Sequence, residues 1–500
     1  MSAKILVGPL LGLESESCYS VCFSSAASVS EAAVVVTDSI TGDEQIISAS
    51  SVGKVASGCV WRATIAIQAQ NRATELSYRV LLGGTSASNS ADTSQWSFSV
   101  PVLGSKPNMA YGSCNGFSSL DIMTKTERPY ALWESLQANH ESSPYAALLM
   151  GGDQVYADSI WGAVPELRKW NELPLDEKKR RKASTLMVAQ IDRFYDQLYR
   201  DRWSNPAMNM MMASIPSVMM WDDHDIFDGW GSFPESLQSC AVFQAIFERA
   251  RHYFLLFQIR SLENTALMDA EKSFYSQGVP FHGYHILALD NRSERTREQV
   301  MGSDHWNCLN SYLEGKVDSG DLLLMSAVPV VYRDFTMTET AFDYTPWEEE
   351  LTDDLKDHWR AKGHEGERAR LIMRLLQNAR RRPNNRTLIL SGDVHIGCAG
   401  VILDRRDPVQ RFKIHQVVSS GIVHPAPSRV QWLGIMAVTN DKSEYLTEDR
   451  SIKVSLLKPF GSKQYIRTRN FVTLSDGNDG KLWVNWITEN GDRPYYPLDR

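Results

Sequence analysis

Residues 148–158 read LLMGGDQVYAD: an apolar run, two glycines, then an acid followed three positions later by a tyrosine. The apolar run has the composition of a buried β-strand. Gly151 and Gly152 permit a tight turn at its end, so Asp153 is expected to project beyond the strand. A carboxylate in that position could bind a metal ion, and Tyr156 could act as a second ligand for the same ion. Taken alone, the motif is equally compatible with Asp153 capping a helix.

The same arrangement, polar residues directly after an apolar strand, recurs at four other places. Residues 110–116 (AYGSCNG) include Cys114, whose thiolate is a good ligand for zinc or ferric iron. Residues 387–397 (TLILSGDVHIG) place Asp393 and His395 on one side of an extended segment, because positions i and i+2 share a face. Two ligands placed in this way can bind neighbouring ions.

Residues 218–230 (VMMWDDHDIFDGW) carry the densest group of acids. The acids are Asp222, Asp223, Asp225 and Asp228, and His224 lies among them. No Lys or Arg accompanies them, and like charges raise one another's pKa unless a cation neutralises them. The segment therefore indicates a metal or substrate site.

Residues 285–295 (HILALDNRSER) end another apolar run with Asp290 and Arg292. A guanidinium suits two-pronged recognition of phosphate, or orientation of a carboxylate that binds a metal. A purely structural bridge between Asp290 and Arg292 accounts for the pattern equally well.

The segment from about residue 105 to 420 alternates buried apolar strands with helices, which predicts an α/β fold. Helices are expected over residues 176–202 and 238–258 and within 364–380. Since α/β folds place ligand sites beyond the carboxyl ends of their strands, the five polar segments are expected to converge.

The flanking regions have β texture. Residues 1–104 hold short strands separated by polar turns at the spacing of a β-sandwich, which predicts a small all-β domain of immunoglobulin or fibronectin type. Residues 105–500 are assigned to a catalytic domain with a β tail over about 405–500, where residues 469–487 (RNFVTLSDGNDGKLWVNWI) predict a hairpin. A chain of 500 residues commonly divides in this way.

Composition excludes some functions. The net charge of −8 argues against a stoichiometric nucleic-acid partner, because phosphate backbones require a basic face. No apolar run reaches the ~20 residues that span a bilayer, so no membrane partner is expected. Seven cysteines without CxxC spacing, and no signal peptide or twin arginine at the N-terminus, favour reduced thiols in the cytoplasm. No pattern indicates an oligomeric state.

The segments GSCNG, GGDQVYAD, WDDHDIFD, LDNRSERTREQ and LSGDVH, in this order, resemble the PhoD-like branch of the calcineurin-type metallophosphoesterases, which are alkaline phosphatases and phosphodiesterases. The resemblance covers most of residues 105–420, and residues 1–104 resemble that family's N-terminal β domain. It implies a core β-sandwich flanked by helices. Ordinary calcineurin-type enzymes open with Asp-x-His and close with Gly-His-x-His. Here Cys114, Tyr156 and Asp393 take the PhoD-type positions.

The resemblance also implies two metal positions. A ferric iron (or zinc) site would use Cys114, Asp153, Tyr156 and His395. A site for calcium or another divalent cation, manganese or magnesium, would use Asp153, Asp393 and one residue of segment 218–230. In relatives that segment reads closer to WDDHE followed by Asn-Asn, and an Asn amide is the ligand. Asp228 stands in its place and is ranked ahead of Asp223, while His224 is expected to contact phosphate or donate a proton.

Together these features predict hydrolysis of phosphate monoesters or diesters by a metal-activated water, with a small phosphoester as the binding partner. Asp153 would fix the separation of the ions, and Arg292 or His224 would steady the phosphoryl oxygens. Residues 157–180 and 333–362 are expected to set the ester preference. Two alternatives are a non-catalytic calcium-binding interaction protein, and a metallohydrolase acting on a non-phosphate ester.

Overall fold

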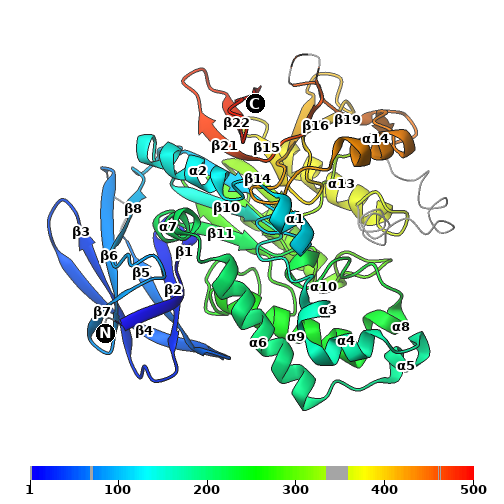
Figure 1. Ribbon diagram of the computed structural model, residues 1–500. Coiled ribbons are helices and arrows are strands. Elements are labelled where there is room, and N and C mark those ends of the chain that lie inside the picture. Colours follow the sequence, from blue (N-terminus) through cyan, green and yellow to red (C-terminus); the bar gives the residue numbers. More distant parts are fainter. Residues whose placement is uncertain (1–2, 68–70, 334–358, 460, 462, 500) are drawn as a thin grey trace.

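The computed structural model describes residues 3–67, 71–333, 359–459, 461 and 463–499. Two β-sheets stack face to face, and helices cover the outer surface of each (Figure 1). The expected α/β fold is present. Within the described residues, no helix combines the length and apolar content needed to cross a bilayer. All seven cysteines are described and none forms a disulfide.

The N-terminal strands form a ring rather than two separate sheets. β1 pairs with β2 on one side and with β7 on the other, and the order β2-β5-β4-β3-β6-β7 closes the circle. The bounds are β1 (Ala3–Ser15), β2 (Cys18–Ala26), β3 (Ala32–Asp38), β4 (Glu44–Val55), β5 (Gly58–Ala66), β6 (Thr74–Leu82), β7 (Thr85–Ser88) and β8 (Trp96–Val100), which pairs with β6. The strands expected from the sequence are all there, but their closure corrects the sandwich arrangement.

The ring is continuous with the first core sheet. β1 also pairs in parallel with β11, through Gly12 and Ser217, so one strand belongs to both the ring and the core sheet (Figure 1). The sheet continues as β11 (Ser217–Met220), β10 (Ala147–Gly151), β9 (Met109–Gly112), β21 (Asn470–Asp476), β22 (Leu482–Thr488) and β23 (Tyr495–Leu498). The hairpin predicted over residues 469–487 is confirmed as β21 and β22. The domain boundary at residue 104 stays a prediction.

The second sheet runs in the order β12-β13-β14-β15-β17-β16-β19-β18, with β20 beside β16. Its strands are β12 (Gln277–Phe281), β13 (Tyr284–Leu289), β14 (Asp321–Ser326), β15 (Thr387–Ser391), β16 (Gly397–Asp404), β17 (Phe412–Val418), β18 (Glu444–Tyr445), β19 (Ile452–Leu456) and β20 (Tyr465–Ile466). The C-terminal tail therefore supplies strands to both sheets.

Side chains along each core strand face the other sheet and the covering helices in turn. In β10, Leu149 faces the second sheet, while Leu148 and Met150 pack against helices, because successive side chains point to opposite faces. In β14, Leu323 faces the first sheet and Leu324 packs under helices. Helices α2 (Ala131–Ser142), α6 (Thr185–Arg202), α7 (Pro206–Ser214) and α9 (Ala241–Phe257) cover the first sheet, and α10 (Ser303–Gly315) and α13 (Glu365–Arg381) cover the second.

The single helix predicted over residues 176–202 is divided into two helices. Residues 176–202 contain α5 (Leu175–Arg180) and α6, because the chain is extended at Arg181 and the Ser184 side chain accepts from the Met187 N–H to cap a new helix. The helices expected near 238–258 and 364–380 are α9 and α13. The short helices are α1 (Leu120–Lys125), α3 (Ile160–Ala163), α4 (Pro165–Asn171), α8 (Glu235–Gln238) and α14 (Arg429–Val438), with a single 3₁₀ turn over Asp223–Asp225.

Candidate metal centre

The strand ends that carry polar residues converge. β9, β10 and β11 are neighbouring parallel strands, so their carboxyl ends lie at one edge of the sheet. Their loops are tied together by backbone bonds: Cys114 N–H donates to Gly152 O at 3.2 Å, and Ala157 N–H to His224 O at 2.6 Å. The loop after β15, from the other sheet, reaches the same place with His395.

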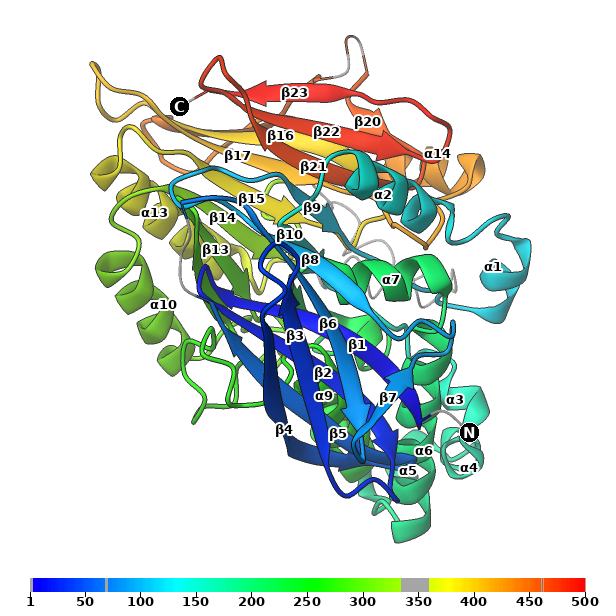
Figure 2. The same ribbon diagram turned by 90° about the vertical axis from the view of Figure 1, so that its left-hand side faces the viewer.

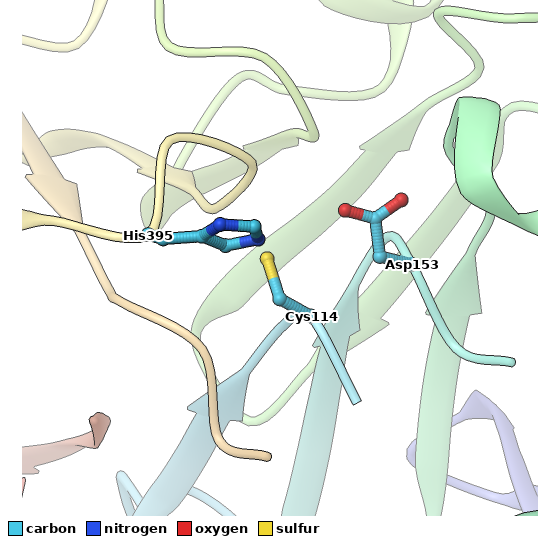
Figure 3. Close-up of side chains that lie close together, drawn as sticks. All are labelled: Cys114, Asp153 and His395. Carbon is cyan, nitrogen blue, oxygen red and sulfur yellow. The ribbon is translucent and has the colours of Figure 1, made fainter. Parts of the chain in front are cut away.

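Cys114, Asp153 and His395 form one compact group. Each offers one ligand atom, and these atoms all lie within 4.8 Å of one another. Figure 3 shows the three side chains pointing toward a common point from three separate loops. Tyr156 joins them, because its hydroxyl lies 3.0 Å from His395 Nε2. The structure thus brings together the four residues predicted for the ferric-type position.

The backbone at this group is unusual. Cys114, Asp153, Tyr156, Asp393 and His395 all have positive φ, between 51° and 66°. Non-glycine residues seldom adopt this conformation, which costs roughly 1–3 kcal/mol per residue and gathers at functional sites.

The turn between β10 and Asp153 also requires its glycine. At Gly152 φ is +101°, and a side chain there would meet Cβ of Asp222 at 3.0 Å and Cβ of Ala327 at 3.1 Å. The tight turn expected from the sequence is therefore needed for close packing as well as for backbone conformation.

The acids of the segment after β11 have different surroundings. Asp153, Asp222 and Asp223 form a second group within 4.8 Å, and Asp223, His224 and Asp228 a third. Asp225 belongs to neither, since its Oδ1 accepts from Gln154 and Val155 N–H at 2.7 and 2.9 Å. It braces the loop after β10.

Asp393 is in none of these three groups. Its carboxylate nevertheless lies near enough to raise the pKa of the Cys114 thiol. Residues 334–358, most of the second segment expected to set ester preference, lie outside the described residues.

Arg292 is buried among these acids. Its guanidinium is bonded to Asp222, reaches Asp223 at 3.2 Å, and donates to Trp230 O at 3.0 Å. Its contact with Asp290 is made by the backbone N–H, at 3.0 Å. The guanidinium thus lies against carboxylates, as expected if it orients them rather than binding phosphate.

Two residues that sequence reasoning missed complete the surroundings. Asp158 holds His224 through Nδ1, and it ends the segment that also carries Asp153. His424 stacks on His395 with ring centroids 3.8 Å apart, and on Tyr156 at 5.3 Å. The backbone N–H of His424 donates to Cys114 O at 3.1 Å. The position of His424 after the strand β17, within GIVHP, was the available signal.

Burial drives the central groups toward their neutral forms. It raises the pKa of Cys114 well above the usual value, and the charges of Asp153 and Asp393 add to the effect. It raises the pKa of Asp153 in the same direction. It lowers the pKa of His395, with His424 contributing. A cation among them would favour the thiolate and the carboxylate.

The residues fit a metal centre. Asp153 is 1% exposed, and one of its carboxylate oxygens accepts no hydrogen bond from any described residue. Thiolate, imidazole and phenolate ligands suit iron or zinc, whereas a set of carboxylates suits calcium, magnesium or manganese. Asp153 belongs to both kinds of group, so one carboxylate could serve two ions.

Comparison with known proteins gives a consistent result. Residues 110–346 and 343–454 match the family model described as PhoD related phosphatase. An uncharacterized protein of Saccharomyces cerevisiae is 28% identical over 366 residues, covering 61% of this chain and 52% of that protein. The chain thus spans about half the length of the curated relative it matches.

Solved structures share the fold. PhoD superposes with a TM-score of 0.61 at 14% identity, covering 99% of this chain and 89% of PhoD. The purple acid phosphatase PPD1 from yellow lupin (Lupinus luteus) seeds gives 0.50 at 12% identity, covering 98% and 74%. At these identities the likeness establishes the fold alone.

Proposed function

Because this chain belongs to the PhoD related phosphatase family, we propose that it is a metal-dependent phosphatase that hydrolyses small phosphate monoesters, diesters or both. The resemblance inferred from the sequence motifs is confirmed by that membership. The observation that carries the proposal is the convergence of Cys114, Asp153 and His395 within 4.8 Å, at the ends of strands from two different sheets.

The first cation would be held by Cys114, Asp153, Tyr156 and His395. The mixed donor set supports iron or zinc rather than an oxygen-only cation. A structural calcium site needs only oxygen ligands, so the thiol and imidazole favour a catalytic centre over a calcium-binding interaction module.

A second cation would be held by Asp153 with acids of the β11 loop. Asp222 and Asp223 group with Asp153 within 4.8 Å, and this supports them over Asp228, the residue ranked first from the family pattern. Asp393 is a further candidate through its nearby charge. Calcium, magnesium or manganese would suit these oxygens. Two bound cations would supply charge neutralisation on the phosphoryl oxygens and a lower pKa for a coordinated water.

The chain's own groups would orient and protonate the ester. His224 is 6% exposed, lies 3.9 Å from Asp228 through Nε2, and is held by Asp158 through Nδ1. We assign to His224 Nε2–H the donation of a proton to the departing alkoxide. Arg292 would position Asp222 and Asp223 instead of touching phosphate.

The test is a substrate screen with and without a chelator. The protein is assayed on p-nitrophenyl phosphate, bis-p-nitrophenyl phosphate and p-nitrophenyl acetate, and its metals are identified by elemental analysis. Turnover of either phosphate, lost on chelation and restored by metal, supports the proposal. Turnover of the acetate alone would establish a carbon esterase, and silence on all three would favour the non-catalytic calcium protein.

A further inference from the structure

The outward face of α13 forms a basic pocket remote from the metal centre. α13 packs beside α10 on the outer side of the second sheet (Figure 2). The cavity has a volume of about 430 Å³. Its lining residues are Arg370, Met373, Arg374, Gln377, Arg380 and Arg406. None of the six is acidic, although the whole chain carries a net charge of −8.

Two of the guanidiniums are fixed by one buried carboxylate. Asp404, 1% exposed, accepts from Arg380 Nε at 3.0 Å and from Arg406 Nε and Nη2 at 3.0 and 2.9 Å. These contacts, with burial opposing them, lower the pKa of Asp404, so it stays ionised. Asp404 neutralises one of the two positive charges, and the exposed acids Asp407 and Asp449 lie near Arg380 and Arg406. Each guanidinium has five N–H groups, so both keep donors for another acceptor.

The other two guanidiniums are also positioned. Arg370 lies over the Trp306 ring, 4.2 Å from its centroid. Arg374 Nη1 donates to Gln377 Oε1 at 3.1 Å. Arginines held in place lose less rotamer freedom on binding than mobile ones, and their planar fork matches phosphate oxygens.

Four guanidiniums around one cavity repel one another unless an anion joins them. Asp404 offsets one of the four charges, so a single phosphate, about −2 at neutral pH, would leave some positive charge unmatched, and the cavity volume admits a larger anion. We propose that this pocket binds an anion bearing several phosphate groups, either free in solution or as a lipid headgroup. The site is separate from the metal centre and does not depend on the proposed hydrolysis.

Binding is measured by titration calorimetry with inositol hexakissulfate, a polyanion that contains no phosphoester to hydrolyse. Removing two guanidiniums, in Arg370→Ala/Arg374→Ala, is expected to weaken binding about a hundredfold, because each charge-assisted bond is worth about tenfold. The matched control removes the same charge from the exposed Arg180 and Arg181, and its affinity should stay within about twofold. The double lysine variant, Arg370→Lys/Arg374→Lys, keeps the charge but loses the fork, and intermediate affinity is expected.

A sedimentation assay tests whether the bound anion is a lipid headgroup or a soluble molecule. It compares binding of the protein to vesicles containing phosphatidylinositol bisphosphate with binding to phosphatidylserine vesicles of equal charge. Preference for the bisphosphate vesicles assigns a headgroup, and binding of the free polyanion alone assigns a soluble ligand. Three results would overturn the pocket: no binding of either probe, equal weakening in the control variant, or wild-type affinity in the double alanine variant.

Discussion

His224 Nδ1 lies 3.0 Å from both carboxylate oxygens of Asp158. A carboxylate only accepts hydrogen bonds, so the hydrogen is placed on Nδ1. The same carboxylate accepts from Asp228 N–H at 2.8 Å, and the His224 ring is stacked on Tyr156 with centroids 4.4 Å apart. Asp158 is therefore a positioning residue: it fixes the imidazole to which proton donation is assigned.

Asp158→Asn tests this relationship. The amide keeps the shape but loses the charge that holds the imidazolium. We expect kcat on phenyl phosphate to fall about a hundredfold, the usual contribution of a placed acid. The loss on 2,4-dinitrophenyl phosphate should be much smaller, because that leaving group departs without a proton. Metal content should not change, and Asp201→Asn, on the exposed surface of α6, is the control. Equal losses on both esters would leave Asp158 with a structural role only.

Asp153→Asn probes the metal centre itself. An amide cannot serve two cations as a carboxylate does, so we expect turnover to fall more than a thousandfold, with at least one metal equivalent lost. Elemental analysis and phosphate assays measure the two effects together. The melting temperatures of the chelator-treated proteins check that the fold survives. Without metal the variant should not melt lower than the wild type, because a buried carboxylate whose pKa is raised by burial does not favour folding at neutral pH. Activity within about tenfold of wild type would remove Asp153 from the proposed ligand set.

The sequence predicted which side chains converge better than it predicted the framework that holds them. Cys114, Asp153 and His395 were recognisable because each is a polar residue in the turn that follows a buried strand. β9, β10 and β11 are parallel neighbours, so the residues that follow them lie at the same edge of the sheet. The two missed residues are recognised by contacts that are distant in the chain: Asp158 by a bond to His224, 66 residues away, and His424 by stacking on His395.

The N-terminal ring had no local signal either. Its strands alternate as a sandwich would, and closure depends on β1 pairing with both β2 and β7. The ligand of the second cation stays a prediction. Asp228 occupies the family's position, while Asp222 and Asp223, at the start of the short 3₁₀ turn, group with Asp153 within 4.8 Å.

Tyr156→Phe identifies the metal by eye. Tyr156 is fully buried, 3.0 Å from His395, and burial raises its pKa well above the usual range. Only a strongly Lewis-acidic cation would hold it as phenolate. If ferric iron is bound, the pure protein should be violet to brown, and the phenylalanine variant should lose this band while keeping iron through Cys114 and His395. Visible absorption and iron analysis of both proteins test this prediction. An iron-containing but colourless protein would exclude phenolate ligation.

Glu14 and Arg62 predict how the fold responds to acid. Their side chains are 0% and 4% exposed, with Glu14 Oε1 2.5 Å from Arg62 Nη2 and Oε2 accepting from Thr265 N–H at 2.9 Å. Burial alone would raise the pKa of Glu14, but Arg62 and Thr265 outweigh it, so the pKa is lowered. The carboxylate therefore stabilises the fold above the unfolded pKa of about 4.3, and this contribution is lost as pH falls through the folded value.

Glu14→Gln should cost about 3 kcal/mol of unfolding free energy at pH 7, since the buried Arg62 keeps only the exposed Glu263, 3.6 Å away, as a charge partner. The matched control is Glu44→Gln, which breaks the exposed pair with Arg79 and should cost under about 1 kcal/mol. Below pH 5 the wild type should lose stability more steeply than the Glu14 variant, because only the wild type takes up that proton on unfolding. Urea titrations across pH 3–7 measure both effects. Parallel pH profiles for the two proteins would show that the pair does not couple folding to Glu14 ionisation.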